Sequence, residues 1–440
     1  MTHPNRRRFL GGALAAGATM LLSGCSTAVA GGLLGRSSSP STLAYWNLFG
    51  GGDGKRMQAM VAAYQAATPQ VTLEPITLKW GNPYYTKLSL ATIGGKPPDV
   101  AVAHMTRVPT LQAAGLLAEL APGDMARHGM TADRFNATAW RAGQVGGSTF
   151  AVPLDTHPFV CFYNTDVCAK AGLLDGSGAL RPITSEDALV DALRRAKQVT
   201  GQFGASVAAV SEQASPWRIF QTLYSQLGGQ MIADSGRQVV IDDAKALRVL
   251  SLLSRLNVDG LMPGNLDYQG AVATFANGRA GFYFQGEWEI TTFQTSKTPF
   301  GMTLFPNVYG GSRYAVQADS HALVLPRRDR SPAELDKALG FVRSMLDQSA
   351  VWAAGGHVPA WLPYRDSPDY AALQPQANYA AAADAAVYDP DAWYSGSGSN
   401  FEIVLGDAIG AVQGGLLTPE AGLARMRDQL TTLATTRPPL

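Results

Sequence analysis

The chain has 440 residues, of which 46% are hydrophobic and 16% charged, and its formal net charge is +1. A chain of this length is too long for one compact core and predicts two lobes. The nearly balanced charge argues against nucleic acid as a partner, because phosphate binding needs a concentrated basic surface.

Residues 1–24 have the pattern of an export signal peptide. Arg6-Arg7-Arg8-Phe9-Leu10 resembles a twin-arginine (Tat) signal, although the same arginines would serve general secretion. The apolar run 10–22 is too short to span a bilayer stably. Leu22-Ser23-Gly24-Cys25 resembles a bacterial lipobox, which predicts a lipid on Cys25, with a buried thiol as the alternative. Residues 25–41 would then tether an extracytoplasmic domain to the cell membrane.

Strands and helices alternate in the first part of the mature chain. Strands are predicted at 42–46, 71–78 and 99–103, with helices at 57–64, 84–93 and 108–114. This order is typical of an α/β layer with mostly parallel strands. The glycine-rich loop 47–54 lacks the spacing of the dinucleotide and P-loop motifs, so no nucleotide is expected there.

Residues 151–166 are predicted to pass from one lobe to the other. A short apolar strand turns at Pro153 and exposes Asp155, Thr156 and His157 to a gap between the lobes. A second strand, 159–163, then leads into a helix. A ligand would lie in this gap.

The cysteines and histidines carry little further chemistry. Cys161 is expected on a strand and Cys168 on the next helix, so a disulfide and two buried thiols both remain open. Six His are scattered along the chain, and the Cys lack metal-site spacing. We therefore expect no metal centre and no cofactor.

Further helices and strands follow the crossing. Helices are predicted at 185–199, 216–227, 242–256, 272–276, 332–346, 401–413 and 419–433, and strands at 280–284, 300–305 and 322–325. In residues 351–400, aromatic side chains are spread among Pro, Gly and Ser, and such loops place aromatic faces at clefts.

Five short motifs follow one another along residues 42–433. They are Gly95-Lys96-Pro97-Pro98-Asp99-Val100, Ala114-Gly115-Leu116-Leu117-Ala118-Glu119-Leu120, Ala151-Val152-Pro153 before Phe162-Tyr163-Asn164-Thr165-Asp166, Phe275-Ala276-Asn277-Gly278-Arg279-Ala280-Gly281 before Gly286-Glu287-Trp288, and Gly356-His357-Val358-Pro359. Together they resemble the solute-binding proteins of ABC importers, in the carbohydrate-binding group that includes maltose-binding proteins. Asp319-Ser320-His321 and the aromatic tail depart from that pattern.

The resemblance implies an α/β, two-lobed periplasmic-binding-protein type II fold that closes over one solute by a hinge. Lobe one would comprise residues 42–155 and 306–350, and lobe two residues 156–305 and 351–440. We expect a monomer without enzymatic activity that captures a neutral di- or oligosaccharide and delivers it to a membrane permease.

Sugars present hydroxyl rims and weakly apolar C–H faces, so their sites need aromatic surfaces and hydrogen-bonding groups. Trp288 is the main stacking candidate, Asp155 and Glu287 are candidate acceptors, and His104 ends a strand at the sheet edge that ligands favour. Core packing or plain solvation is the alternative for each candidate. The full set is Trp46, Asn47, His104, Asp155, His157, Glu287, Trp288, His321, Trp352 and Trp393.

Two other functions stay open at this point. A secreted carbohydrate-active hydrolase would need two carboxylates about 5–10 Å apart, and no acidic pair falls at two strand ends in a recognisable pattern. A binding protein for a polyol phosphate or a peptide is the other, with Arg107 and Arg313 as the cations for an anionic ligand.

Overall fold

A computed structural model describes residues 41–311 and 314–437. The predicted signal peptide, Cys25 and the tether up to residue 40 lie outside the described residues. Within them, no helix combines the length and the apolar character that crossing a membrane requires.

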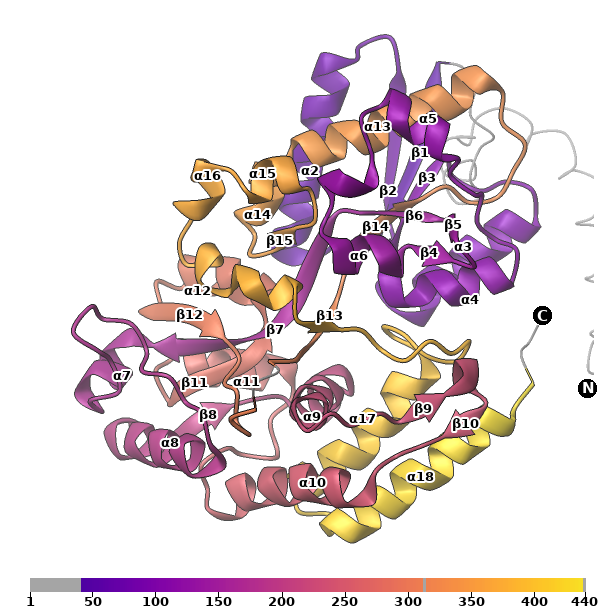
Figure 1. The fold of residues 1–440 in the computed structure, drawn as a ribbon. Helices are drawn as coiled ribbons and strands as arrows, with labels where there is room; N and C mark the ends of the chain where they lie inside the picture. The colour runs from indigo at the N-terminus through magenta and orange to yellow at the C-terminus, as the bar shows by residue number, and fades with distance from the viewer. Residues whose placement is uncertain (1–40, 312–313, 438–440) are drawn as a thin grey trace, which may run out of the picture.

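The chain folds into two lobes, each built on one β-sheet (Figure 1). The sheet of lobe one has the strand order β2-β1-β3-β14-β6. β1 pairs in parallel with β2 and β3, as predicted, whereas β14 is antiparallel to both of its neighbours. These strands are β1 (Thr42–Asn47), β2 (Thr72–Thr77), β3 (Val100–His104), β6 (Ala151–Pro153) and β14 (His321–Val324).

Helices and one short hairpin complete lobe one. They are α2 (Gly51–Ala67), α3 (Asn82–Ile93), η1 (Met105–Arg107), α4 (Val108–Ala113), α5 (Pro122–Arg127), η2 (Ala132–Arg134), α6 (Ala137–Ala142), α13 (Pro332–Asp347), α14 (Ser349–Ala353) and the hairpin β4 (Gln144–Val145) and β5 (Ser148–Thr149). α2 begins inside the predicted glycine-rich loop, with Asp53 in its first turn, where a carboxylate complements the helix dipole.

The sheet of lobe two is organised around β7 (Asp155–Asn164), a fully buried strand of ten residues. Its order is β16-β13-β7-β11-β8, and β12 and β15 also pair with β7. The other strands are β8 (Phe203–Ser206), β11 (Ala280–Gly286), β12 (Phe300–Leu304), β13 (Val316–Asp319), β15 (Val358–Pro359) and β16 (Ala386–Val387). β7 therefore replaces the exposed turn and separate strand that we predicted for this segment.

The remaining elements surround the second sheet or bridge the lobes. They are α7 (Thr165–Lys170), α8 (Glu186–Thr200), α9 (Ala214–Gln226), α10 (Asp243–Val258), α11 (Tyr268–Ala276), η4 (Glu287–Glu289), α12 (Ile290–Thr295), α15 (Leu362–Arg365), α16 (Pro368–Ala371), η5 (Gln376–Ala383), α17 (Asn400–Gln413), α18 (Pro419–Thr435), and β9 (Ile232–Ala233), η3 (Asp234–Gly236) and β10 (Gln238–Val239).

Polar caps explain why several helices begin where the sequence predicts. At the start of α8, the Ser185 hydroxyl accepts a hydrogen bond from the backbone N–H of Ala188. At the start of α10, the Asp242 carboxylate accepts one from the backbone N–H of Lys245. Ser331 and Glu334 form a reciprocal capping box at α13. Each such cap stabilises a helix by about 1 kcal/mol.

Three passages of the chain between the lobes lie side by side. The first runs from β6 through Leu154 into β7, and the second from β13 through Ser320 into β14. The third follows α14, where β15 pairs with the first residues of β7. The Leu154 N–H donates to the carbonyl of His321 at 2.8 Å and its own carbonyl accepts from Ala360 at 3.2 Å, so the first passage joins the other two.

The boundary between the lobes differs from the predicted one. Residues 306–350 were expected in lobe one, but β13 pairs with β7, and Phe305, Val308 and Val316 pack in the core of lobe two. The contribution of this region to lobe one begins at β14, and Trp352 and Trp361 pack in the core of lobe one. The prediction missed β13 because it is short and two of its four residues are polar.

The aromatic tail serves packing. Trp352 and Trp361 are buried in lobe one, and Tyr370 and Tyr379 are buried in a third cluster beneath β7 and β11. Cys161 and Cys168 are both buried and free, so the two thiols form no disulfide.

Two helical glycines should respond oppositely to alanine. A Cβ on Gly406 of α17 would overlap the carbonyl oxygen of Gln213 beside α9, whereas a Cβ on Gly340 of α13 would meet only a ring carbon of His128 at 3.8 Å. We expect Gly406→Ala to lower the free energy of unfolding by about 1–3 kcal/mol. Gly340→Ala should raise it by about 0.5–1 kcal/mol through helix propensity. Urea unfolding of both variants checks this, and equal signs would contradict the packing described.

Candidate functional site: the cleft between the lobes

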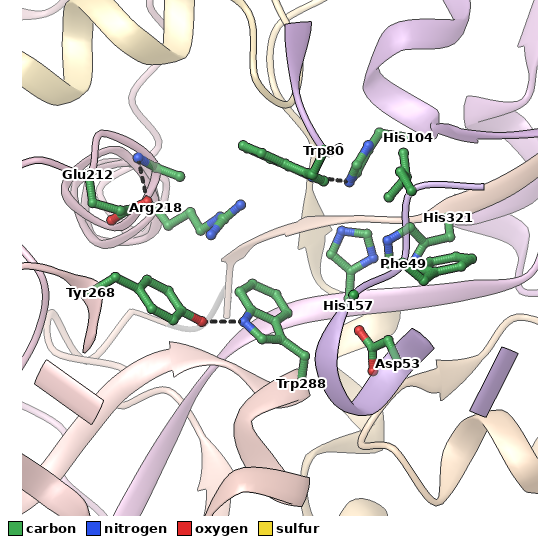
Figure 2. Close-up of a pocket in the computed structure, with 13 residues that line it drawn as sticks. Phe49, Asp53, Trp80, His104, His157, Glu212, Arg218, Tyr268, Trp288 and His321 are labelled. Carbon is green, nitrogen blue, oxygen red and sulfur yellow. Dashed lines mark hydrogen bonds between the residues drawn. The ribbon is translucent and has the colours of Figure 1, made fainter. Parts of the chain in front are cut away.

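A cleft of about 280 Å³ lies where the two lobes face each other (Figure 2). Its thirteen lining residues come from both lobes. Lobe one contributes Leu48, Phe49, Gly50, Asp53, Trp80, His104 and His321, and lobe two contributes His157, Glu212, Ala214, Arg218, Tyr268 and Trp288.

Two tryptophans from opposite lobes supply the aromatic surfaces of the cleft. Trp80 follows β2 and is 41% exposed, and its Nε1–H donates to Nε2 of His104 at 3.3 Å. Trp288 lies in η4 after β11, and its Nε1–H donates to the Tyr268 hydroxyl at 2.8 Å (Figure 2). Because protein groups satisfy both indole N–H donors, neither indole needs a ligand atom as its hydrogen-bond partner.

The Arg218 guanidinium lies over the Trp288 ring, 5.0 Å from its centroid. This cation–π contact fixes the ring and places one cation at the wall of the cleft. The Tyr268 hydroxyl in turn donates to Glu289 at 2.5 Å, so a chain of hydrogen bonds holds this wall in place.

Three histidines cluster in the cleft. The rings of His157 and His321 have centroids 4.3 Å apart, and His104 lies 5.1 Å from His321. Burial, together with the neighbouring imidazoles, lowers the pKa of His104 well below its ordinary value. Burial also lowers the pKa of His157 to about 3. At neutral pH these two rings are therefore neutral, and each can donate one hydrogen bond and accept another.

Asp155 positions two of these rings from beneath the cleft. Its carboxylate, which is fully buried, accepts from Nδ1 of His157 at 3.2 Å, and from the backbone N–H and Nδ1 of His321, both at 2.8 Å. The indole N–H of Trp352 donates to it at 2.6 Å. Burial alone would raise the pKa of Asp155, but the imidazoles of His321 and His357 hold it well below the ordinary range.

His357 lies deeper, among three carboxylates. Its Nε2 is 3.2 Å from Asp53, and its Nδ1 is 2.9 Å from Glu287 and 3.3 Å from Asp155. Burial opposes protonation, yet Asp53 and Asp155 raise the pKa of His357 well above its ordinary value. Burial raises the pKa of Glu287 to about 7.

A tight backbone approach brings His357 to this position. The preceding residue, Gly356, has φ of 114°, and a Cβ there would come within 2.5 Å of the carbonyl oxygen of Glu287. Only glycine fits such a conformation and such a contact. The Gly-His pair in the sequence therefore marks a site where two segments of backbone touch.

The structure distributes the ten candidate residues over three environments. His104, His157, Trp288 and His321 line the cleft. Asp155, Glu287 and Trp352 are buried directly beneath the cleft and do not line it.

The other three candidates lie elsewhere. Trp46 is fully buried in the core of lobe one, because both faces of the central strand β1 are covered. Asn47 accepts from the N–H of Phe49 and the hydroxyl of Thr77, away from the cleft. Trp393 packs against the core of lobe two.

Sequence reasoning missed several residues of the cleft. Trp80 precedes Gly81 in a loop, and an exposed tryptophan beside a glycine was a usable signal. Arg218 and Tyr268 lie on helices of lobe two, and nothing local distinguishes them from surface residues. Glu212 accepts from the backbone N–H groups of residues 214 and 215, so its carboxylate also caps α9.

A cleft lined from two lobes is the arrangement that a two-lobed solute receptor requires. The family model for the bacterial extracellular solute-binding proteins matches residues 59–327, more than half of the chain, and the chain belongs to this family.

Curated relatives agree with this assignment. The maltooligosaccharide ABC transporter solute-binding lipoprotein of Streptococcus pneumoniae is 24% identical over 302 residues, which span 65% of each chain. The match thus covers slightly less than two thirds of that relative.

Solved structures show the same fold. The GacH receptor of Streptomyces glaucescens, studied unliganded and with acarbose, superposes with a TM-score of 0.75 at 17% identity, covering 89% of this chain and 98% of that one. The cyclic alpha-maltosyl-1,6-maltose binding protein of Arthrobacter globiformis gives 0.72 at 19% identity, covering 90% and 99%. The two-lobed α/β fold predicted from the sequence is confirmed.

A buried carboxylate behind Arg218 should make stability depend on pH. Burial raises the pKa of Glu402 to about 7, although the Arg218 guanidinium lies 3.9 Å away. The folded protein therefore keeps a proton that the unfolded chain releases near pH 4.5. Its contribution to stability is present at low pH and lost as the pH rises through 7.

In the wild type, this proton should make the melting temperature fall between about pH 5 and pH 7.5, which corresponds to a loss of at most about 3 kcal/mol in the free energy of unfolding. We expect Glu402→Gln to make this fall smaller. The exposed Glu420→Gln is the matched control and should leave the pH profile unchanged. Calorimetric melting across this range is the measurement. Parallel profiles for wild type and Glu402→Gln would show that Glu402 is ionised in the folded protein.

Proposed function

We propose that this protein captures a neutral saccharide between its lobes and delivers it, chemically unchanged, to the permease of an ABC importer. The observation that carries the proposal is the pair of indoles, Trp80 and Trp288, one from each lobe of the cleft. Aromatic faces suit the C–H faces of a sugar, and closure of the hinge would bring both indoles onto one ligand.

Polar groups between the indoles suit hydroxyl groups. The Nδ1 of neutral His157 faces Asp155, which leaves its Nε2 as an acceptor; the Asp53 carboxylate is a second acceptor, and the Arg218 guanidinium supplies donors around the same space. The cleft volume of about 280 Å³ lies just below the usual range for ligand pockets, about 300–1,000 Å³. This volume favours a short saccharide.

The carboxylates support binding without catalysis. Among the thirteen lining residues only Asp53 and Glu212 are acidic, and both oxygens of Glu212 accept from the first turn of α9. A glycosidase needs a proton-donating acid and a second free carboxylate facing the same bond. The sole guanidinium in the lining, Arg218, is already engaged over Trp288, which weighs against a phosphorylated ligand.

The relatives support the proposed transport role. The Streptococcus pneumoniae relatives are named solute-binding lipoproteins of a maltooligosaccharide ABC transporter. Export through the signal at residues 1–24, by the Tat route or by general secretion, and a lipid on Cys25 would place this protein as a monomer at the outer face of the membrane, beside its permease.

Binding and the absence of turnover are tested together. We expect titration calorimetry with maltose and maltotriose to show one site per chain and heat release, and chromatography of the recovered sugar to show its original length. Shortened sugar would establish the hydrolase alternative. No heat with any neutral saccharide of a broader panel would refute sugar capture.

Replacing Trp288 tests the stacking surface. Trp288→Ala should weaken saccharide binding by about 10–100-fold, because the ring supplies contact area and a partner for Arg218. Trp288 is half-buried, so melting of the ligand-free protein should change little. The matched control is Trp393→Ala, a half-buried tryptophan outside the cleft, which should retain the wild-type affinity. Equal losses of affinity in the two variants would contradict the assignment.

A further inference from the structure

Four of the six histidines converge at the cleft or directly beneath it. His104, His157, His321 and His357 come from distant parts of the sequence, and the rings of His321 and His357 have centroids 5.5 Å apart. Scattered positions led us to expect no metal centre from the sequence, but folding brings three of these rings around one carboxylate.

The nitrogen atoms of three rings face the same group. Nδ1 of His157, His321 and His357 lies 3.2, 2.8 and 3.3 Å from the carboxylate oxygens of Asp155. One donor atom from each of these four residues lies within 4.8 Å of the other three. Donors around a tetrahedral Zn²⁺ are about 3.3 Å apart, since each bond is about 2.0–2.1 Å long. The distances from His321 and His357 to Oδ2 of Asp155 and from His157 to Oδ1 are near that value, and the remaining donor pairs lie within 4.8 Å.

We propose that Asp155, His157, His321 and His357 bind one divalent transition-metal ion of the zinc type. Imidazole nitrogens select Zn²⁺, Ni²⁺ or Cu²⁺, whereas Ca²⁺ and Mg²⁺ require mainly oxygen donors. Four protein donors complete a tetrahedral shell and leave no open position, which is typical of a structural ion.

The surroundings supply the outer contacts that such sites need. Ligating histidines usually direct their second nitrogen to a carboxylate, and Nε2 of His357 is 3.2 Å from Asp53. The Trp352 indole N–H orients Asp155, and its ring stacks on His357 with centroids 4.4 Å apart.

Buried polar atoms of His357 and Glu287 that lack hydrogen-bond partners in the described part of the chain also support a bound ion at this place. Both ring nitrogens of the fully buried His357, and both carboxylate oxygens of the fully buried Glu287, have charged neighbours but no well-directed hydrogen bond among the described residues. Three carboxylates, Asp53, Asp155 and Glu287, surround His357, so a dication would offset buried negative charge.

The site would link the three interlobe passages. Asp155 and His157 belong to the first, His321 to the second and His357 to the third. A metal bound to Nδ1 of His157 and His321 would fix the two rings that also line the cleft. The ion is proposed to set the geometry of the binding surface and does not depend on which solute binds.

The direct test uses tag-free, chelator-treated protein without sugar. We expect titration calorimetry with Zn²⁺ to give one ion per chain, a higher melting temperature, and, with Co²⁺ as a probe, the intense visible absorption of a tetrahedral complex. Absence of saturable binding, or a weak octahedral Co²⁺ spectrum, would overturn the proposal. Saccharide titrations are separate, so failure of sugar capture would leave this result standing.

Variants locate the ion. His357→Gln removes a ligand that does not line the cleft and should lower Zn²⁺ affinity about 100-fold or more, whereas His128→Gln on lobe one should retain the wild-type affinity. Should His357→Gln fail to fold, Asp53→Asn at the start of α2 removes only the outer contact and should cost about 10–100-fold. Wild-type Zn²⁺ affinity in either folded variant would refute the site.

Discussion

The architecture depends on one buried carboxylate at the point where the chain changes lobes. Asp155 receives hydrogen bonds from two imidazoles, one indole and one backbone amide, which belong to three separate passages between the lobes. A fully buried, ionised carboxylate needs such partners, because an unpaired buried charge is strongly destabilising. The hydrogen bonds to Asp155 therefore connect the passages between the lobes and orient His157 and His321.

The two walls of the cleft differ in character. Lobe one presents His104, His321 and the exposed Trp80, whereas lobe two presents His157 and a Trp288 that is fixed between Arg218 and Tyr268. Neither wall alone encloses a ligand, so we expect binding to be linked to closure of the hinge. The ligand would select the arrangement in which both walls contact it.

Local patterns were sufficient for much of the fold. Apolar periodicity and polar caps such as Ser185 and Asp242 located the long helices, and the parallel order of the first strands followed from their alternation with helices. The sequence analysis did not predict β13, because this strand is short and two of its four residues are polar. Its place in the second sheet also depends on pairing with β7, which is distant in the sequence. Strand pairing of this kind is a tertiary property that local spacing does not encode.

The site was predictable only in part, for a related reason. His104 ends β3, His321 begins β14 and Trp288 follows β11, and such positions at a sheet edge favour ligands, whereas His157 is the third residue of β7. Trp46 also lies near a strand end, but whether its side chain faces the core or the edge depends on the layers that cover β1. Trp80 and Arg218 reach the cleft through the relative placement of the lobes, and the cluster at His357 depends on three passages meeting.

The two thiols in the described part of the chain have a practical consequence for measuring motion between the lobes. Cys161 and Cys168 are buried, and burial raises the pKa of the Cys168 thiol to about 12, so neither forms the reactive thiolate readily. A cysteine introduced on the surface of each lobe would thus react with maleimide dyes or spin labels ahead of both. Interlobe distances could be followed during ligand binding without first replacing two residues that pack inside lobe two.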